Sequence, residues 1–234
     1  MINKLQKEII EEFKRLDRGS SKFDLPKYLG TDNKFYHLKT AVQKQIAKEF
    51  VKKHPNITKE EFLELLNALN VGESSNERTF GTTLISRKKE FKDLFTPKRV
   101  FEWLANLSGW CEVDSLCQST FGARDLLEDW VNWEKTITKM ARDKNISRRR
   151  ASLVLLTRSV RESNDERLAK LAFENLEKLK SEKDILITKA VSWILRSLIK
   201  HHREQVVSYI NANRQILPKI AIRETERKLK TGRK

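Results

Sequence analysis

Several residue types are scarce in this chain, and their scarcity excludes whole classes of protein. The 234 residues include 2 cysteines, 4 histidines, 4 prolines and 7 glycines. The histidines show no ligand spacing with carboxylates, which weighs against a metal site, and no glycine-rich loop supports nucleotide hydrolysis. Cys111 and Cys117 point to different sides of one expected helix, so we expect no disulfide between them. No apolar run could cross a bilayer, and the N-terminal residues hold no apolar signal core.

Positive charge is abundant by contrast. The chain carries 48 Lys and Arg against 32 Asp and Glu, a formal net charge of +16. Because basic surfaces attract phosphate and release its counterions, nucleic acid is the leading partner class. A merely solvated lysine-rich surface is the alternative, and a membrane-surface role is a weaker one. We expect a protein of the bacterial cytoplasm, associated with the nucleoid when bound to DNA.

Apolar residues recur at helical spacing almost throughout, which predicts an all-α protein. A capping box at Thr58 and Glu61 marks one helix start. Short helices with short connections favour stacked helical hairpins, forming one domain over residues 1–234 in a curved solenoid with a basic concave groove. Residues 223–234 form a basic tail, and a polar loop at 19–21 precedes a turn at 26–29. The predicted helices cover residues 2–16, 38–53, 58–69, 74–91, 97–107, 110–120, 125–141, 147–160, 165–178, 184–201, 204–212 and 218–229.

Three segments near the starts of expected helices carry unusual side chains. The first holds Trp110 and Asp114, which lie four residues apart and therefore share one helix face. The second is the arginine run 148–150, followed by Ala-Ser-Leu. The third is the string Lys-Ala-Val-Ser-Trp-Ile-Leu-Arg at 189–196. Equivalent positions of successive repeats line one face of a solenoid, so we expect these segments to meet in one groove.

In their order and spacing, these segments resemble the AlkD-like family of DNA alkylation repair glycosylases, which are built from HEAT-like repeats. The resemblance rests on the Trp-x-x-Val-Asp run ending at Asp114, on the arginine before Ala151, and on the string around Trp193. It covers nearly the whole chain, beginning around Tyr28. The chain departs from the family pattern at Ser192, where glycine is usual, and at residues 185–186, where many members carry paired aromatics. The family's usual proline is also missing near residues 39–41.

The resemblance implies a monofunctional DNA glycosylase that releases positively charged alkylated purines, of the N3-methyladenine and N7-methylguanine type, in base excision repair. Asp114 corresponds to the catalytic carboxylate, and Trp110 and Trp193 correspond to aromatics that flank the sugar of the lesion. The implied partner is double-stranded DNA with alkylated bases, bound by a monomer without metal or cofactor. The residues predicted to contact DNA are Arg150, Arg149, Arg148, Lys189, Tyr28 and Lys39.

Two other functions fit parts of the same sequence. A helical-repeat protein could bind distorted or branched nucleic acid without chemistry, although the presence of Trp110, Asp114 and Trp193 together argues against this. Curved helical arrays also serve as protein-binding scaffolds, and the net charge would then favour acidic partners. Freed base and abasic sites in a methylated duplex would select the glycosylase, and salt-sensitive binding alone would select the non-catalytic reader.

Overall fold

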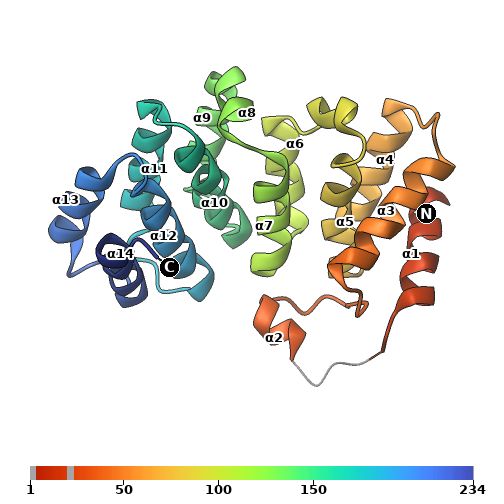
Figure 1. The fold of residues 1–234 in the computed structure, drawn as a ribbon, viewed down its shortest axis with the longest axis horizontal. Coiled ribbons are helices and arrows are strands. Elements are labelled where there is room, and N and C mark those ends of the chain that lie inside the picture. Colours follow the sequence, from red (N-terminus) through yellow and green to blue (C-terminus); the bar gives the residue numbers. More distant parts are fainter. Residues whose placement is uncertain (1–3, 20–23, 234) are drawn as a thin grey trace. The chain divides into compact units, whose positions relative to one another are not determined.

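The structure confirms an all-α protein built from stacked helices (Figure 1). The computed structural model describes residues 4–19 and 24–233. These contain no β-strand, and an isolated bridge pairs Lys34 with Ser74. The predicted positions 2, 3, 20, 21 and 234 lie outside the described residues. Contacts divide the chain into two compact units, Met1–Thr120 and Phe121–Lys234, so the single domain over 1–234 stays a prediction.

In the N-terminal unit, α5 lies at the centre and contacts α3, α4 and α7. Phe80 of α5 meets the buried ring of Phe13 edge to face at 5.0 Å between centroids, and the buried ring of Phe62 packs with Phe91 at 5.3 Å. Burial of each such ring stabilises the unit by about 1.5–3 kcal/mol. The helices are α1 (Lys4–Leu16), α2 (Leu25–Leu29), α3 (Thr40–Lys53), α4 (Lys59–Asn70), α5 (Ser75–Ile85), α6 (Pro97–Trp103) and α7 (Gly109–Thr120), with 3-10 turns η1 (Lys89–Leu94) and η2 (Leu104–Asn106).

Reciprocal capping boxes account for two helix starts in this unit. Thr58 and Glu61 form the predicted capping box at α4, and Ser74 and Glu77 form a second box at α5. The predicted helix 74–91 is wrong in its second half, because α5 ends at Ile85 and the separate turn η1 follows. At that end the Ser86 hydroxyl donates to the Thr83 carbonyl at 2.6 Å, a local bond that competes with continuation of the helix.

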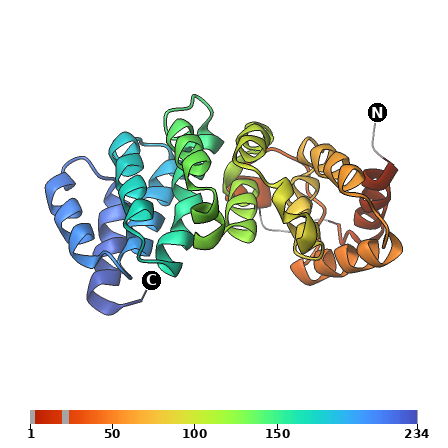
Figure 2. The ribbon, with the colours of Figure 1, turned by 90° about the horizontal axis from the view of Figure 1, so that it is seen from above.

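In the C-terminal unit, α12 packs between α10 and α14, whereas α11 and α13 contact α12 on another side. Figure 2 shows the helices of this unit packed together, from α8 in green to α14 in dark blue. Every residue from Arg150 to Thr157 on α10 is buried, because α8, α9, α11 and α12 surround this helix. The helices are α8 (Ala123–Glu128), α9 (Trp130–Met140), α10 (Ile146–Glu162), α11 (Glu166–Leu179), α12 (Ile185–Leu198), α13 (Arg203–Asn213) and α14 (Lys219–Thr231).

The predicted helix 125–141 is wrong as a single element. It divides into α8 and α9 at Asp129, whose backbone takes the non-helical angles φ −123° and ψ 47°. The Asp129 carboxylate accepts a hydrogen bond from the Asn132 amide at 2.7 Å, which favours a new helix start at this position. Both short helices contact α10, so the chain turns here to keep each apolar face on the same neighbour.

The length and composition of the helices decide whether one of them could span a membrane. Within residues 4–19 and 24–233, no helix combines the length and the apolar content that a bilayer span requires.

Candidate functional site

The structure brings Tyr28 of α2 and Trp110 of α7 together. The indole Nε1 of Trp110 donates a hydrogen bond to the backbone carbonyl of Tyr28 at 2.7 Å. The two rings meet edge to face, with centroids 5.4 Å apart and planes at 89°. Tyr28 is 55% exposed and Trp110 is half-buried, so this aromatic pair faces solvent rather than the core. Asp114, one helical turn further along α7, is also half-buried.

A close approach of two backbones fixes where α7 begins. Gly109, the first residue of α7, has φ +69°. A Cβ atom at this position would lie 2.2 Å from the carbonyl oxygen of Leu29 and 2.8 Å from that of Gly30. Only glycine tolerates both the left-handed backbone and the contact. The end of α2 therefore rests directly on the start of α7, and this places Tyr28 beside Trp110.

A buried carboxylate that the sequence reasoning missed lies on the same helix. Glu112 is 0% exposed and accepts hydrogen bonds from the Asn33 side-chain amide at 2.8 Å and from the Ser108 backbone N–H at 2.9 Å. A carboxylate four residues after a helix-start serine was the available signal, since such side chains reach back to the first N–H groups. Asn33 gave no signal, because 79 residues separate it from Glu112.

The negative charge of Asp114 affects the pKa of the neighbouring Cys111 thiol. Burial raises the pKa of Cys111, and the negative charges of Glu112 and Asp114 raise the pKa further. Both cysteines are free thiols, and Cys117 is fully buried. The reactivity of the Cys111 thiol should therefore respond to removal of either negative charge.

Replacing Asp114 with asparagine should accelerate alkylation of Cys111 by iodoacetamide at pH 8. Removing the negative charge lowers the pKa of the thiol, so more thiolate is present and the rate should rise by about twofold or more. Mass spectrometry of the labelled protein measures this rate, and Cys111→Ser identifies the reacting thiol. The exposed carboxylate of Glu102 on α6 supplies the control, since Glu102→Gln should leave the rate unchanged. An unchanged rate in Asp114→Asn would show that this carboxylate does not act on the thiol.

Lys39 lies at the edge of a cavity in the N-terminal unit. It is the exposed N-cap residue of α3, whose first turn has no side-chain cap. The cavity has a volume of about 480 Å³, and Arg18, His37 and Cys111 also line it. Cations therefore gather close to α7, on a face that could receive phosphate.

The three consecutive arginines of α10 have different surroundings. Arg148 pairs with Asp143 at 3.1 Å, and Arg149 pairs with Glu182 at 2.8 Å. The Arg150 side chain is 3% exposed, and its guanidinium donates to the carbonyl of Leu186 at the start of α12. Two of the three thus pair with acids, and Arg150 joins α10 to α12. A phosphate contact by any of them stays a prediction.

On α12, Lys189 and Trp193 lie four residues apart and share a face, Lys189 exposed and Trp193 half-buried. The departure at Ser192 has a structural role: its hydroxyl is buried and donates to Glu224 of α14 at 2.5 Å. Arg196 pairs with the same carboxylate at 3.3 Å. Ile185 at the helix start is 57% exposed. Trp193 belongs to the C-terminal unit, so a common site with the α7 residues stays a prediction.

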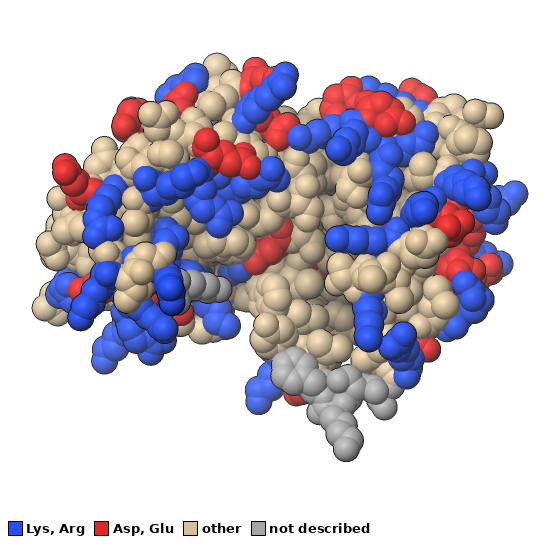
Figure 3. Space-filling view, viewed as in Figure 1, with Lys and Arg blue, Asp and Glu red and all other residues tan. Residues whose placement is uncertain are grey.

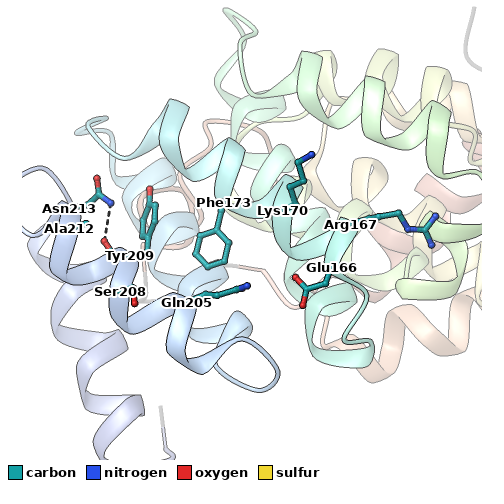
Figure 4. Close-up of a pocket in the computed structure, with 9 residues that line it drawn as sticks. All are labelled: Glu166, Arg167, Lys170, Phe173, Gln205, Ser208, Tyr209, Ala212 and Asn213. Carbon is teal, nitrogen blue, oxygen red and sulfur yellow. Dashed lines mark hydrogen bonds between the residues drawn. The ribbon is translucent and has the colours of Figure 1, made fainter.

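Another cavity, of about 760 Å³, opens between α11 and α13 (Figure 4). The rings of Phe173 and Tyr209 lie side by side on its wall, with centroids 5.3 Å apart. None of the predicted catalytic or DNA-contacting residues lines this cavity. Its walls belong to helices other than α10, α12 and α14, so we do not assign the predicted chemistry to it.

The surface around these elements is basic. Figure 3 shows Lys and Arg side chains spread over this face of each unit, whereas Asp and Glu side chains form smaller groups. Within the part of the chain that the structure describes, no group of three or more His, Cys, Asp or Glu residues is placed to hold a metal ion. A basic surface attracts polyanions such as nucleic acid, and stacked helical repeats present extended binding surfaces.

Comparison with known proteins identifies the family. The sequence model described as DNA alkylation repair enzyme matches residues 9–229, so the chain belongs to that family and has a role in DNA alkylation repair. The fold is similar to that of a solved structure described as a predicted DNA alkylation repair enzyme from Enterococcus faecalis. That match has a TM-score of 0.71 and 16% identity, and it covers 88% of this chain and 93% of the other. A comparison with curated proteins finds no match.

Proposed function

We propose that this protein is a DNA glycosylase that hydrolyses the N-glycosidic bond of positively charged alkylated purines. The observation that carries the proposal is the half-buried Asp114 one helical turn from Trp110, on a helix whose start is held against Tyr28. Family membership supplies the substrate class, since alkylation at N3 of adenine or N7 of guanine produces a cationic base. Double-stranded DNA with such bases is the proposed partner, bound by a monomer in the cytoplasm.

The chemistry suits a single carboxylate. A cationic base is already a good leaving group, so the enzyme need not protonate it. Positive charge develops on the sugar as the bond breaks, and a nearby carboxylate stabilises this oxocarbenium-like state and can orient the attacking water. Asp114 is the residue we assign to this role. The product is a free base and an abasic site in the duplex.

Aromatic faces can stabilise the same developing charge. An indole face beside a cation contributes about 0.5–2 kcal/mol through cation–π attraction. The Tyr28 and Trp110 pair is held in place before any substrate arrives, so these side chains would lose little conformational entropy on reaching the transition state. We also assign Trp193 of α12 to a contact with the lesion strand, and Lys189 and Lys39 to phosphates, which set the register without reading sequence.

A base-release assay tests the proposal directly. The protein is incubated with a duplex treated with a methylating agent and with the untreated duplex, and chromatography with mass spectrometry identifies any freed base. Alkaline cleavage of the strand counts abasic sites. We expect N3-methyladenine or N7-methylguanine to appear from the treated duplex alone. Salt-sensitive binding with no base released would instead support a non-catalytic reader of distorted DNA.

Replacing Arg150 with alanine should weaken DNA binding by about 1 kcal/mol or more and reduce the salt dependence of the affinity by roughly one counterion. We attribute both losses to one phosphate contact, which the guanidinium of Arg150, 3% exposed in the structure, would make only after releasing the Leu186 carbonyl. Fluorescence anisotropy at several salt concentrations measures both quantities. Because Arg150 also bridges α10 to α12, thermal unfolding of the variant is measured in parallel. The control Lys170→Ala removes an exposed cation from α11, and an equal loss of affinity there would contradict a specific role for Arg150.

A further inference from the structure

The contact between Tyr28 and Trp110 lies at the end of α2, next to a chain segment that is not helical. The indole of Trp110 donates to the carbonyl of Tyr28 in α2, and the chain then crosses to α3 through residues 30–39, which form no helix. The close approach of Gly109 to Leu29 and Gly30 holds the start of this segment against α7. Hydrogen bonds hold the residues that follow.

Glu112 provides that attachment. Its carboxylate accepts from Asn33 of the segment at 2.8 Å and from the Ser108 backbone N–H at 2.9 Å. A second link joins the hydroxyls of Thr31 and Ser108 at 2.7 Å, and the Asn33 amide also donates to the Ser108 hydroxyl at 3.1 Å. The segment is thus tied to the start of α7 by directional hydrogen bonds centred on one carboxylate.

Burying a carboxylate costs more free energy than burying an apolar side chain of the same size. Glu112 is fully buried, and the nearest guanidinium nitrogen, on Arg78, lies 3.8 Å from it. That guanidinium already donates to the carbonyl of Gly72 at 2.8 Å and to that of Asn106. A buried charge without ideal pairing contributes little to stability compared with an apolar side chain of the same size. What the carboxylate supplies is a fixed geometry that an apolar side chain cannot impose.

We infer that Glu112 and Asn33 are a positioning pair that holds Trp110 and Tyr28 as a preformed aromatic corner beside Asp114. The pair does not touch the substrate; it sets where the indole lies when the sugar arrives. Because a misplacement of about 1 Å near a reacting centre costs roughly 100-fold in rate, loss of the pair should lower kcat more than DNA affinity. This inference rests on the proposed glycosylase function.

Exchange of the two side chains provides the test. In Glu112→Gln one of the two accepting oxygens becomes an NH2 donor, which then faces either the Asn33 amide or the Ser108 N–H, and in Asn33→Asp a second carboxylate faces Glu112. The double variant restores one donor facing one acceptor and the original net charge. We expect each single variant to lower kcat by about tenfold or more with KM changed by less than about threefold, and the double variant to recover most of the loss.

A spectroscopic signal reports the geometry without catalysis. The protein is labelled with 5-fluorotryptophan, and the ¹⁹F resonance of Trp110 is assigned by its loss in Trp110→Phe. We expect this resonance to shift or broaden in each single variant and to return in the double variant. Glu182→Gln, which removes a half-buried carboxylate from its pair with Arg149, is the matched control and should leave the resonance unchanged.

The outcomes separate the two proposals. A wild-type kcat and an unmoved Trp110 resonance in both single variants would overturn the positioning role. Failure of the double variant to restore either quantity would overturn the pairing. If the wild type releases no methylated base while the resonance still follows the pair, the glycosylase proposal fails and the structural pairing stands. Should Asn33→Asp not fold, Asn33→Ala removes the donor without adding charge, and an unmoved resonance in that variant would also overturn the inference.

Discussion

Replacing Asp114 with asparagine is expected to reduce release of methylated base by roughly 100- to 1,000-fold. Asparagine has the same shape, but its neutral amide cannot stabilise the positive charge that develops on the sugar. DNA affinity should stay the same or rise slightly, because the change removes a negative charge from a surface that binds a polyanion. Single-turnover release of N7-methylguanine measures the first effect, and anisotropy with an uncleaved duplex measures the second.

The control for this prediction is Asp32→Asn, which neutralises an exposed carboxylate of the segment between α2 and α3. Base release by that variant should match the wild type. Normal excision by Asp114→Asn would end the assignment of this residue as the catalytic group. Equal losses in both variants would instead indicate a general electrostatic effect on the N-terminal unit.

Replacing Gly109 with alanine is expected to lower the free energy of unfolding by about 2–4 kcal/mol. The left-handed backbone disfavours any side chain, and the new Cβ would lie 2.2 Å from the Leu29 carbonyl oxygen. Backbone, unlike the end of a flexible side chain, cannot move aside cheaply. Relief requires that α2 separate from α7, so the Tyr28 and Trp110 contact should be lost as well. Urea unfolding followed by tryptophan fluorescence measures the change in stability.

Gly19 offers a matched control for the glycine effect. Its φ of +81° is also left-handed, but no atom lies within 4 Å of a Cβ built there. Gly19→Ala should therefore cost only the backbone strain, about 1 kcal/mol. The difference between the two variants is the cost of the α2–α7 contact. Equal destabilisation at the two positions would show that this contact does not contribute to the free energy of unfolding.

Much of the fold follows from local patterns. The apolar spacing predicts most helices to within a few residues, because a helix in this fold buries one stripe and leaves the rest to water. The capping box at Thr58 and Glu61 is a local signal and is confirmed. The break at Asp129 was missed, because the apolar periodicity continues across it, and the turn is decided by both short helices packing on α10.

For the candidate site, the sequence by itself determined that Trp110 and Asp114 share a helix face, since four residues make about one turn of an α-helix. It also determined the excess of positive charge. Only the tertiary structure decided that Tyr28 meets Trp110, that Gly109 rests on the Leu29 carbonyl, and that Asn33 reaches Glu112. These contacts join residues about 80 positions apart in the sequence. Hydrogen bonds between such distant segments produce no periodic pattern in the amino-acid sequence.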